Sequence, residues 1–418
     1  MVILESEMAA TNSGGGSSLV AAAPHAGMDP DLSQLDERLA DHDVDGYLID
    51  AASEDADQYY LSGFDAPDPF LTLYDGSVRL LFTRSLEFGR AKRESHAKTV
   101  ERLTDYGYDD LLDSYDPAEA VVRGRAAFLD AYDVESVAAP PRFPLQTADG
   151  LREQGVDVVV DDSETVTEIR ASKTDEEIEH VRAAQEANEA AMQAAEDLLR
   201  RADADGDRLV VDGEVLTSEW VKETIEVTLL RHGCALDETI VACGADAADP
   251  HDRGSGPLEP DEPIIVDIFP RDKATKYHAD MTRTFCAGEP DPEVREWYDL
   301  TERAYRAALD AVEPGATGKD VHDAACDVYE DAGLPTLRND PSTETGFIHS
   351  TGHGVGLDVH ELPRIAPDGG ELEPGHVITI EPGLYDPDVG GVRIEDLVVV
   401  TEDGHENLTD YPVSLVVE

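Results

Sequence analysis

Five side chains that commonly bind metal ions occur in order across the last third of the chain, each within a short apolar or glycine-rich segment. They are Asp267, Asp280, His353, Glu381 and Glu395. A buried carboxylate is costly unless it is paired with a cation or bound to a metal. Apolar stretches that repeatedly carry an acid or an imidazole therefore predict a buried site, and a two-metal hydrolytic centre explains it best.

The first two acids lie in a predicted β-hairpin. Residues 262–271 (EPIIVDIFPR) form a β-branched apolar run that predicts a buried strand containing Asp267. After a turn, residues 277–285 (YHADMTRTF) predict a second strand, in which Asp280 shares a face with two threonines. This hairpin can direct both carboxylates at one point.

The other three side chains come from two further predicted strands and a glycine-rich segment. Glu381 ends the alternating strand of HVITIEPGLY, and Glu395 lies with Arg393 on one face of a strand predicted for GGVRIEDLVVV. His353 lies in FIHSTGHGVGLDVHE, where alternate glycines make a helix unfavourable and would let the backbone approach a ligand closely. Each residue alone is weak evidence, because isolated strand acids and histidines are common, but the ordered set predicts a metal site.

These segments resemble the pita-bread metallopeptidase superfamily, which includes methionine aminopeptidases, aminopeptidase P, Xaa-Pro dipeptidases (prolidases) and creatinase. GHGVGLDVHE, VITIEPGLY, GGVRIED and DMTRTF are most similar to the proline-specific branch, and the resemblance covers roughly residues 30–418. One departure is that Asp267 and Asp280 are 13 positions apart, where the family usually has 11. The two extra residues fall in the turn 271–276, where insertions cost little.

The resemblance implies an α+β chain, with a C-terminal pita-bread catalytic domain preceded by a smaller α/β domain of the creatinase/prolidase N-terminal type. It also implies roles: Asp267 would chelate one metal, Asp280 and Glu395 would bridge both, and His353 with Glu381 would complete the second. Four carboxylates and one imidazole form a hard donor set that favours Mn²⁺, with Co²⁺, Fe²⁺ or Zn²⁺ as alternatives. A water between the metals would attack the scissile carbonyl, with Glu381 as the proton shuttle.

Three more histidines and one arginine are predicted to contact the substrate. By resemblance, His251, His349 and His360 would hold the substrate carbonyl and the carboxylate on the proline side, although each could also be an ordinary surface residue. Arg393 could bind a substrate carboxylate through two hydrogen bonds, or it could hold a bridging acid in place.

The composition excludes some partners. The chain has 92 acidic and 32 basic residues and a formal net charge of -60, which argues against nucleic acid and anionic membranes. The acids are spread along the whole length, as in proteins of salt-accumulating halophiles, where molar salt shortens the Debye length to about 3 Å. We therefore expect the fold to loosen in low salt; unchanged far-ultraviolet circular dichroism after dialysis into dilute buffer would contradict this.

Cysteine usage and hydropathy predict the compartment. Four well-separated cysteines without a CxxC pair suggest a reducing cytoplasm, and the apolar stretches are too short to span a bilayer. A homodimer is expected from the resemblance.

Composition shifts predict three segments. Residues 1–28 are small, polar and unpatterned, which predicts a disordered extension. Alternating strand and helix signals over 29–165 predict the α/β domain, and 166–418 the catalytic domain. A capping box of Thr174 and Glu177 predicts the start of a long amphipathic helix just after this boundary.

The predicted function is a dinuclear metal-dependent hydrolase of Xaa-Pro bonds, acting on a small peptide with proline at the second position, as a dipeptidase or an aminopeptidase P. Alternatives are a methionine aminopeptidase, a creatinase-like amidinohydrolase and a non-catalytic relative. The spacing of Asp203, Asp205, Asp207 and Glu214 fits a calcium loop, but Arg208 replaces the glycine that such a loop needs.

Overall fold

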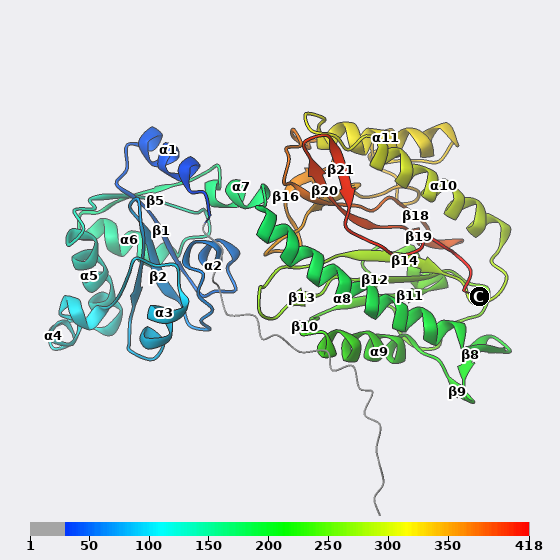
Figure 1. Ribbon diagram of the computed structural model, residues 1–418, viewed down its shortest axis with the longest axis horizontal. Helices are drawn as coiled ribbons and strands as arrows, with labels where there is room; N and C mark the ends of the chain where they lie inside the picture. Colours follow the sequence, from blue (N-terminus) through cyan, green and yellow to red (C-terminus); the bar gives the residue numbers. More distant parts are fainter. Residues whose placement is uncertain (1–29, 418) are drawn as a thin grey trace, which may run out of the picture.

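The computed structural model describes residues 30–417 and contains two α/β regions joined by a helical segment (Figure 1). The extension predicted for 1–28 lies outside the described residues. The mixed helix and strand content confirms the predicted α+β class.

The first region is built on a six-stranded mixed sheet in the order β4-β3-β2-β1-β5-β6. Its strands are β1 (Gly46–Ala51), β2 (Phe70–Tyr74), β3 (Val78–Phe82), β4 (Thr99–Arg102), β5 (Ser136–Ala139) and β6 (Asp157–Val160). Its helices are α1 (Ser33–His42), α2 (Ala56–Ser62), α3 (Phe88–Glu94), α4 (Tyr108–Leu112), α5 (Pro117–Asp130) and α6 (Leu145–Glu153), with a short 3₁₀ helix at Leu103–Tyr106. The β2–β3 hairpin turns at Gly76, whose φ of 84° is easily adopted only by glycine.

Helix α7 (Thr165–Ala171) connects the two regions and contacts both, because it packs on α1 and α2 on one side and on strand β16 (Glu361–Ile365) on the other. Helix α8 (Asp175–Arg200) then begins where the capping box predicted it, with the Thr174 hydroxyl accepting from the Glu177 amide. A domain boundary near residue 165 stays a prediction, since α7 belongs equally to both sides.

The second region, which the sequence predicts to be catalytic, has two halves, each with an antiparallel sheet and a helix pair. The first half holds α8, α9 (Ser218–Arg231) and the sheet β11-β12-β14, formed by Thr239–Cys243, Ile264–Ile268 and Met281–Phe285. Apolar side chains of α8 and α9, including Met192 and Ile225, pack on this sheet, where Val266 belongs to the same cluster. Two short strands, β10 (Cys234–Ala235) and β13 (Arg271–Asp272), pair beside it.

The second half holds α10 (Pro292–Asp310), α11 (Gly318–Asp331) and a five-stranded sheet in the order β16-β15-β17-β20-β21. Its remaining strands are β15 (Gly352–Gly354), β17 (Val377–Ile380), β20 (Asp396–Thr401) and β21 (Gly404–Asn407), with a separate hairpin of β18 (Gly383–Asp386) and β19 (Gly390–Arg393). A second apolar core joins these helices to β17, β19 and β20. In Figure 1 the two helix pairs lie on opposite sides of the strands.

Three details differ from the sequence-based expectation. The second hairpin strand begins at Met281, so Asp280 precedes it rather than lying within it. The strand predicted for 390–400 is two strands of different sheets, interrupted at Ile394 and Glu395. The glycines around His353 bring neighbouring backbone close: an added Cβ at Gly352 would lie 2.0 Å from the Thr379 carbonyl oxygen, which is a contact within the protein rather than with a ligand.

The acidic segment that imitated a calcium loop folds as a small sheet. Strands β7 (Asp203–Asp205), β8 (Arg208–Val211) and β9 (Glu214–Val215) pair antiparallel, with Asp205 opposite Arg208. Asp203, Asp205 and Glu214 thus lie in strands and Asp207 in the turn between β7 and β8, so the segment does not have the fold of a calcium loop.

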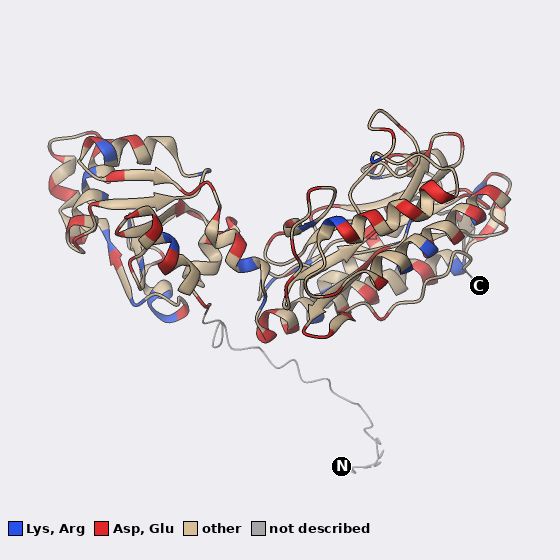
Figure 2. Cartoon of the chain, turned by 90° about the horizontal axis from the view of Figure 1, so that it is seen from above, with Lys and Arg blue, Asp and Glu red and all other residues tan. Residues whose placement is uncertain are grey.

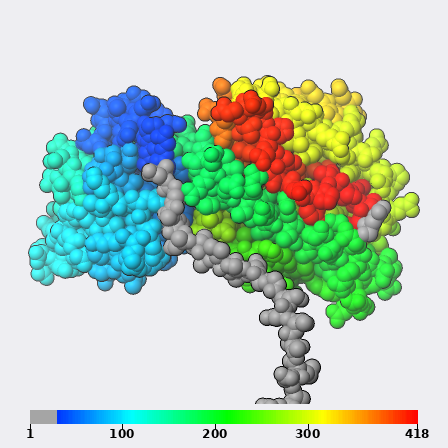
Figure 3. All heavy atoms as spheres, viewed as in Figure 1, coloured from blue at the N-terminus to red at the C-terminus, as the bar shows by residue number. Residues whose placement is uncertain are grey.

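Acidic residues are dispersed over the surface of both regions and outnumber the basic ones (Figure 2). The C-terminal segment lies along α8 (Figure 3), where Gln185 donates to the Thr409 hydroxyl at 2.8 Å. Among residues 30–417, no helix combines the length and apolarity needed to cross a bilayer.

Candidate active site

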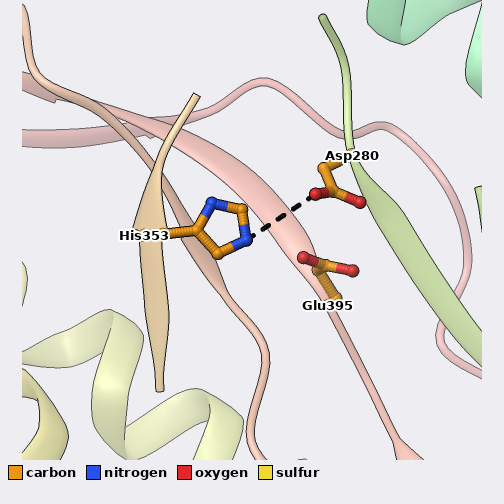
Figure 4. Close-up of side chains that lie close together, drawn as sticks. All are labelled: Asp280, His353 and Glu395. Carbon is orange, nitrogen blue, oxygen red and sulfur yellow. Dashed lines mark ion pairs between the residues drawn. The ribbon is translucent and has the colours of Figure 1, made fainter. Parts of the chain in front are cut away.

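A cavity of about 1060 Å³ contains all five side chains that the sequence singled out as ligands. The nearest ligand atoms of Asp280, His353 and Glu395 all lie within 4.8 Å of one another (Figure 4). His353 Nε2 is 3.3 Å from Glu381 Oε1 and 3.8 Å from Asp280 Oδ2. Asp267 lines the same cavity from the middle of β12.

The two halves of the catalytic region meet at this cluster. Asp267 pairs across the β12–β14 ladder with Thr282, whose hydroxyl donates to Glu395 Oε2 at 2.7 Å. Arg283, fully buried, donates to the Glu395 carbonyl at 2.6 Å and to Asp396 Oδ1 at 2.8 Å. The break between β19 and β20 therefore lies against β14, and it directs the Glu395 carboxylate at the acids of the first half.

The carboxylates repel one another in the absence of a cation. Burial raises the pKa of Asp280 well above its usual value, and the charges of Glu395 and Asp267 raise it further. Burial likewise raises the pKa of Glu381 to about 7 and that of Glu395 well above normal. Such a cluster needs either protons or metal ions to balance its charge.

The protonation state and the orientation of the His353 ring suit a metal ligand. Burial lowers its pKa to about 3, so the ring is neutral at physiological pH. Its Nδ1 lies 3.1 Å from the Gly354 carbonyl oxygen; we assign the proton to Nδ1, because a carbonyl can only accept. The Nε2 lone pair then faces the carboxylates, an unfavourable arrangement that a cation between them would relieve.

Asp267 provides a further test of whether the site fits metal ions. Its Oδ2 accepts from Arg393 Nη2 at 2.7 Å, whereas its buried Oδ1 has no hydrogen-bond partner among the residues that the structure describes. A buried carboxylate oxygen without a partner is unusual and indicates a missing ligand. The orphaned oxygen, the imidazole lone pair and the hard donor set all fit divalent metal ions.

All three guanidinium nitrogens of Arg393 donate hydrogen bonds within the protein. Besides Asp267, it donates from Nη1 to the Tyr385 hydroxyl at 2.8 Å and from Nε to Thr282 Oγ1 at 3.1 Å, and only 3% of the residue is exposed. Of the two roles predicted for it, this geometry supports holding an acid in place, here Asp267, and leaves no face for a substrate carboxylate. Two other arginines, Arg253 and Arg364, also line the cavity. The sequence did not predict them as site residues, because neither lies next to a predicted ligand in a predicted strand.

The three additional histidines line the cavity but differ in availability. His251 and His360 are exposed, and the His360 ring lies edge-on to His353 with 4.2 Å between centroids. His349 uses both nitrogens: Nδ1 lies 2.7 Å from the Ser350 carbonyl oxygen and Nε2 2.9 Å from the Tyr385 hydroxyl. Tyr385, which the sequence reasoning also missed, thus joins His349 to Arg393.

Comparisons with known proteins agree with this geometry. Residues 179–402 match metallopeptidase family M24, and residues 32–172 match the creatinase/prolidase N-terminal domain. A relative named Xaa-Pro dipeptidase, from Pyrococcus furiosus, is 29% identical over 384 residues, covering 90% of this chain and 97% of its own.

Two solved structures are similar over nearly the whole chain. The prolidase of Pyrococcus horikoshii OT3 has a TM-score of 0.74 and 26% identity, over 92% of this chain and 99% of its own. The X-Pro aminopeptidase of Thermotoga maritima has a TM-score of 0.72 and 26% identity, over 90% and 98%. These matches confirm a creatinase-type N-terminal domain followed by a pita-bread catalytic domain, and the chain belongs to metallopeptidase family M24.

Proposed function

We propose that the protein hydrolyses the bond between an N-terminal residue and a following proline, as an Xaa-Pro dipeptidase or an Xaa-Pro aminopeptidase. The observation that carries this proposal is the convergence of Asp280, His353 and Glu395 with Glu381 and Asp267 in one cavity. The substrate class comes from the names of the relatives, which include both kinds of enzyme.

The family and the cluster together imply divalent metal ions. We propose two ions, with Asp267 on one, His353 and Glu381 on the other, and Asp280 and Glu395 shared. Mn²⁺ suits this oxygen-rich set best, and Co²⁺, Fe²⁺ or Zn²⁺ are alternatives. When bound, such ions would polarise the scissile carbonyl and lower the pKa of a water to near neutrality.

The surrounding residues orient the reacting groups. Thr379 Oγ1 is 3.3 Å from Glu381 Oε1 and fixes the carboxylate that we propose as the proton shuttle. The Nε2 atom of an exposed His360, or that of His251, can donate to the substrate carbonyl as negative charge develops on its oxygen. His349, with both nitrogens occupied, supports Tyr385 instead.

The cavity also has the surfaces that a prolyl peptide needs. Ile240, Phe269 and Ile348 provide an apolar wall for the pyrrolidine ring. Because Arg393 is committed to Asp267, we propose Arg364, whose side chain is 61% exposed, as the cation for the substrate carboxylate. A homodimer and a cytoplasmic location stay predictions.

The test compares initial hydrolysis rates in molar KCl, after chelation and Mn²⁺ reconstitution, for an Xaa-Pro dipeptide and the tripeptide extended by one residue. Cleavage of the dipeptide alone would identify a prolidase, and cleavage of the tripeptide an aminopeptidase. A methionyl peptide without proline and creatine serve as controls for the two alternative activities. If two metals bind and neither prolyl peptide is cut, the proposal is wrong.

A further inference from the structure

A buried network of charges runs from the N-terminal domain to the wall of the active-site cavity. Arg170 of α7 stands at its centre, between Asp57 of α2 and Glu361 at the start of β16. The side chains of these three residues are 3%, 1% and 2% exposed. None of them belongs to the proposed metal ligands.

The planar guanidinium of Arg170 donates hydrogen bonds in two directions. Nη1 donates to Asp57 Oδ1 at 2.8 Å, and Nη2 donates to Glu361 Oε2 at 2.9 Å and to Asp358 Oδ2 at 2.8 Å. Because a guanidinium is rigid, the fixed angle between the two nitrogens sets where residues 356–364 lie relative to α2. We call these residues the catalytic segment.

The catalytic segment is built around the Glu361 carboxylate. Its second oxygen pairs with Lys173, which is also fully buried. A Cβ added at Gly356 would lie 2.3 Å from Glu361 Oε1, so the chain can fold over the carboxylate only with glycine at that position. Burial alone would raise the pKa of Glu361, but Lys173 and Arg170 hold it below its usual value, and the group is charged.

The residues on either side of Glu361 face the cavity. Val359, His360 and Arg364 line it, and the His360 ring contacts His353. Thr167 of α7 lines it as well, and its hydroxyl lies 3.3 Å from Asp57 Oδ2. Arg170 is therefore the charged contact that attaches the wall assigned to the substrate to the N-terminal domain, beside an apolar cluster that includes Tyr60, Val355 and Leu357.

We propose that Asp57 and Arg170 are positioning residues, through which the N-terminal domain fixes the segment that carries His360 and Arg364 and so sets substrate binding in its own chain. The reason is that displacing the segment would take Glu361 and Asp358 away from the buried Arg170, whereas Asp57 stays fixed within its own domain by a second pair with Arg142. The network therefore favours one relative position of the two domains. This inference rests on the proposed function for its kinetic consequence, but its structural part can be tested independently.

A matched control exists inside the N-terminal domain. Arg125 and Asp50 form another buried pair, with Arg125 Nη1 2.6 Å from Asp50 Oδ2, and neither residue lines the cavity. Asp50→Asn should therefore cost stability without affecting the catalytic wall. Asp57→Asn removes the same charge, from a residue of similar burial, at the junction.

The experiment measures kcat and KM separately for Asp57→Asn, Arg170→Lys and Asp50→Asn, at equal metal content. We expect KM to rise about tenfold or more in the first two variants, with a smaller change in kcat, because a misplaced binding group acts at a distance from the chemistry. Asp50→Asn should keep the wild-type KM, even where its Tm falls. Arg170→Lys decides the question if Asp57→Asn does not fold.

Hydrogen–deuterium exchange of residues 356–364 gives a readout independent of activity. It should accelerate in Asp57→Asn and Arg170→Lys but not in Asp50→Asn. Wild-type KM and wild-type exchange in the junction variants would overturn the proposal, whatever their Tm. If the wild type cleaves no prolyl peptide, the proposed function fails, while the exchange data still decide whether the N-terminal domain holds this wall.

Discussion

The two halves of the catalytic region supply ligands in different ways. In the first half, Asp267 lies in an uninterrupted hairpin strand and Asp280 just before its partner. In the second half, His353 lies at an irregularity of the β15–β16 ladder, Glu381 follows the end of β17, and Glu395 lies in a gap between two strands. Regular pairing thus holds Asp267 in the first half, where Asp280 precedes its strand, whereas all three ligands of the second half lie at strand ends or at interruptions of pairing.

This difference shows which positions of a β-sheet can hold a metal ligand. Side chains within a strand alternate between fixed directions, which suits a carboxylate that arginine will hold. A ligand that must point along the sheet, toward another layer, needs a strand end or an irregularity. The second half accordingly depends on glycine and on hydrogen bonds from the first half to maintain its geometry.

The largest effect should come from removing the ligand that joins the halves. Glu395→Ala should reduce turnover by at least about 10³-fold and lower metal occupancy, since the remaining ligands no longer balance the charge of the ions. Metal analysis together with initial rates checks this. Glu402→Ala, an exposed acid at the end of the same sheet, is the control and should behave as wild type. Two bound metals with retained activity would contradict our ligand assignment.

Arg393→Lys should have the next largest effect, because the metal ligand that Arg393 holds directly is Asp267 of the first half. Lysine cannot donate to Asp267, Tyr385 and Thr282 at once, so Asp267 loses its fixed orientation. We expect metal affinity or kcat/KM to fall about 10- to 100-fold. Titration with Mn²⁺ monitored by calorimetry distinguishes weaker metal binding from a loss of substrate binding, which Arg364→Lys should cause instead.

Gly354→Ala tests the dependence of the second half on close backbone contacts. The added Cβ would lie 2.1 Å from the Leu362 carbonyl oxygen, and the strands must separate to accept it. The free energy of unfolding should fall by about 1–3 kcal/mol. Gly370→Ala is the control, because a Cβ there meets nothing within 4 Å. Equal denaturation midpoints for the two variants would show that the second half tolerates repacking.

The smallest expected effect is on the pH dependence of stability of the metal-free protein, in which carboxylates from the two halves lie close together. The pKa values of Asp280 and Glu395 are raised well above normal in the folded state, so the folded protein binds more protons than the unfolded chain, and stability is lost as pH rises. Burial lowers the pKa of His349 and His353 to about 3, so these two rings are neutral in the folded protein throughout pH 7 to 9. The Tm of the metal-free protein should therefore fall over this range, and that of the Mn²⁺-loaded protein should change less. A Tm that rises with pH without metal would mean that the carboxylates do not share one site.

The sequence predicted the first half more completely than the second. The alternation in 262–271 located the strand with Asp267, and the capping box located the start of α8, because both signals are local. The gap at Glu395 was not predicted, since 390–400 carries no proline or glycine after Gly391 to mark a break, and the break arises from packing against Arg283. All five ligand candidates nonetheless line one cavity, and their assignment as ligands stays a prediction that rests on charge in an apolar context, which is a local signal.

The roles of cations and hydroxyls were less predictable. Arg393 has the same neighbours in sequence whether it binds a substrate or Asp267, and its partner lies 126 positions away. Arg170 and Glu361 are 191 positions apart, so no spacing rule could pair them. Such contacts depend on how the domains and halves pack, which one sequence does not reveal.

The order of the ligands along the chain also has a consequence for biosynthesis. When the ribosome has completed only the first half, the nascent protein has Asp267 and Asp280 but lacks His353, Glu381 and Glu395, the residues proposed to share the ions with them. Pairings such as Arg283 with Asp396, 113 positions apart, form late, because long loops must close first. Metal acquisition should therefore follow translation, and a truncated chain would be distinguished from a complete one by its failure to retain the metal.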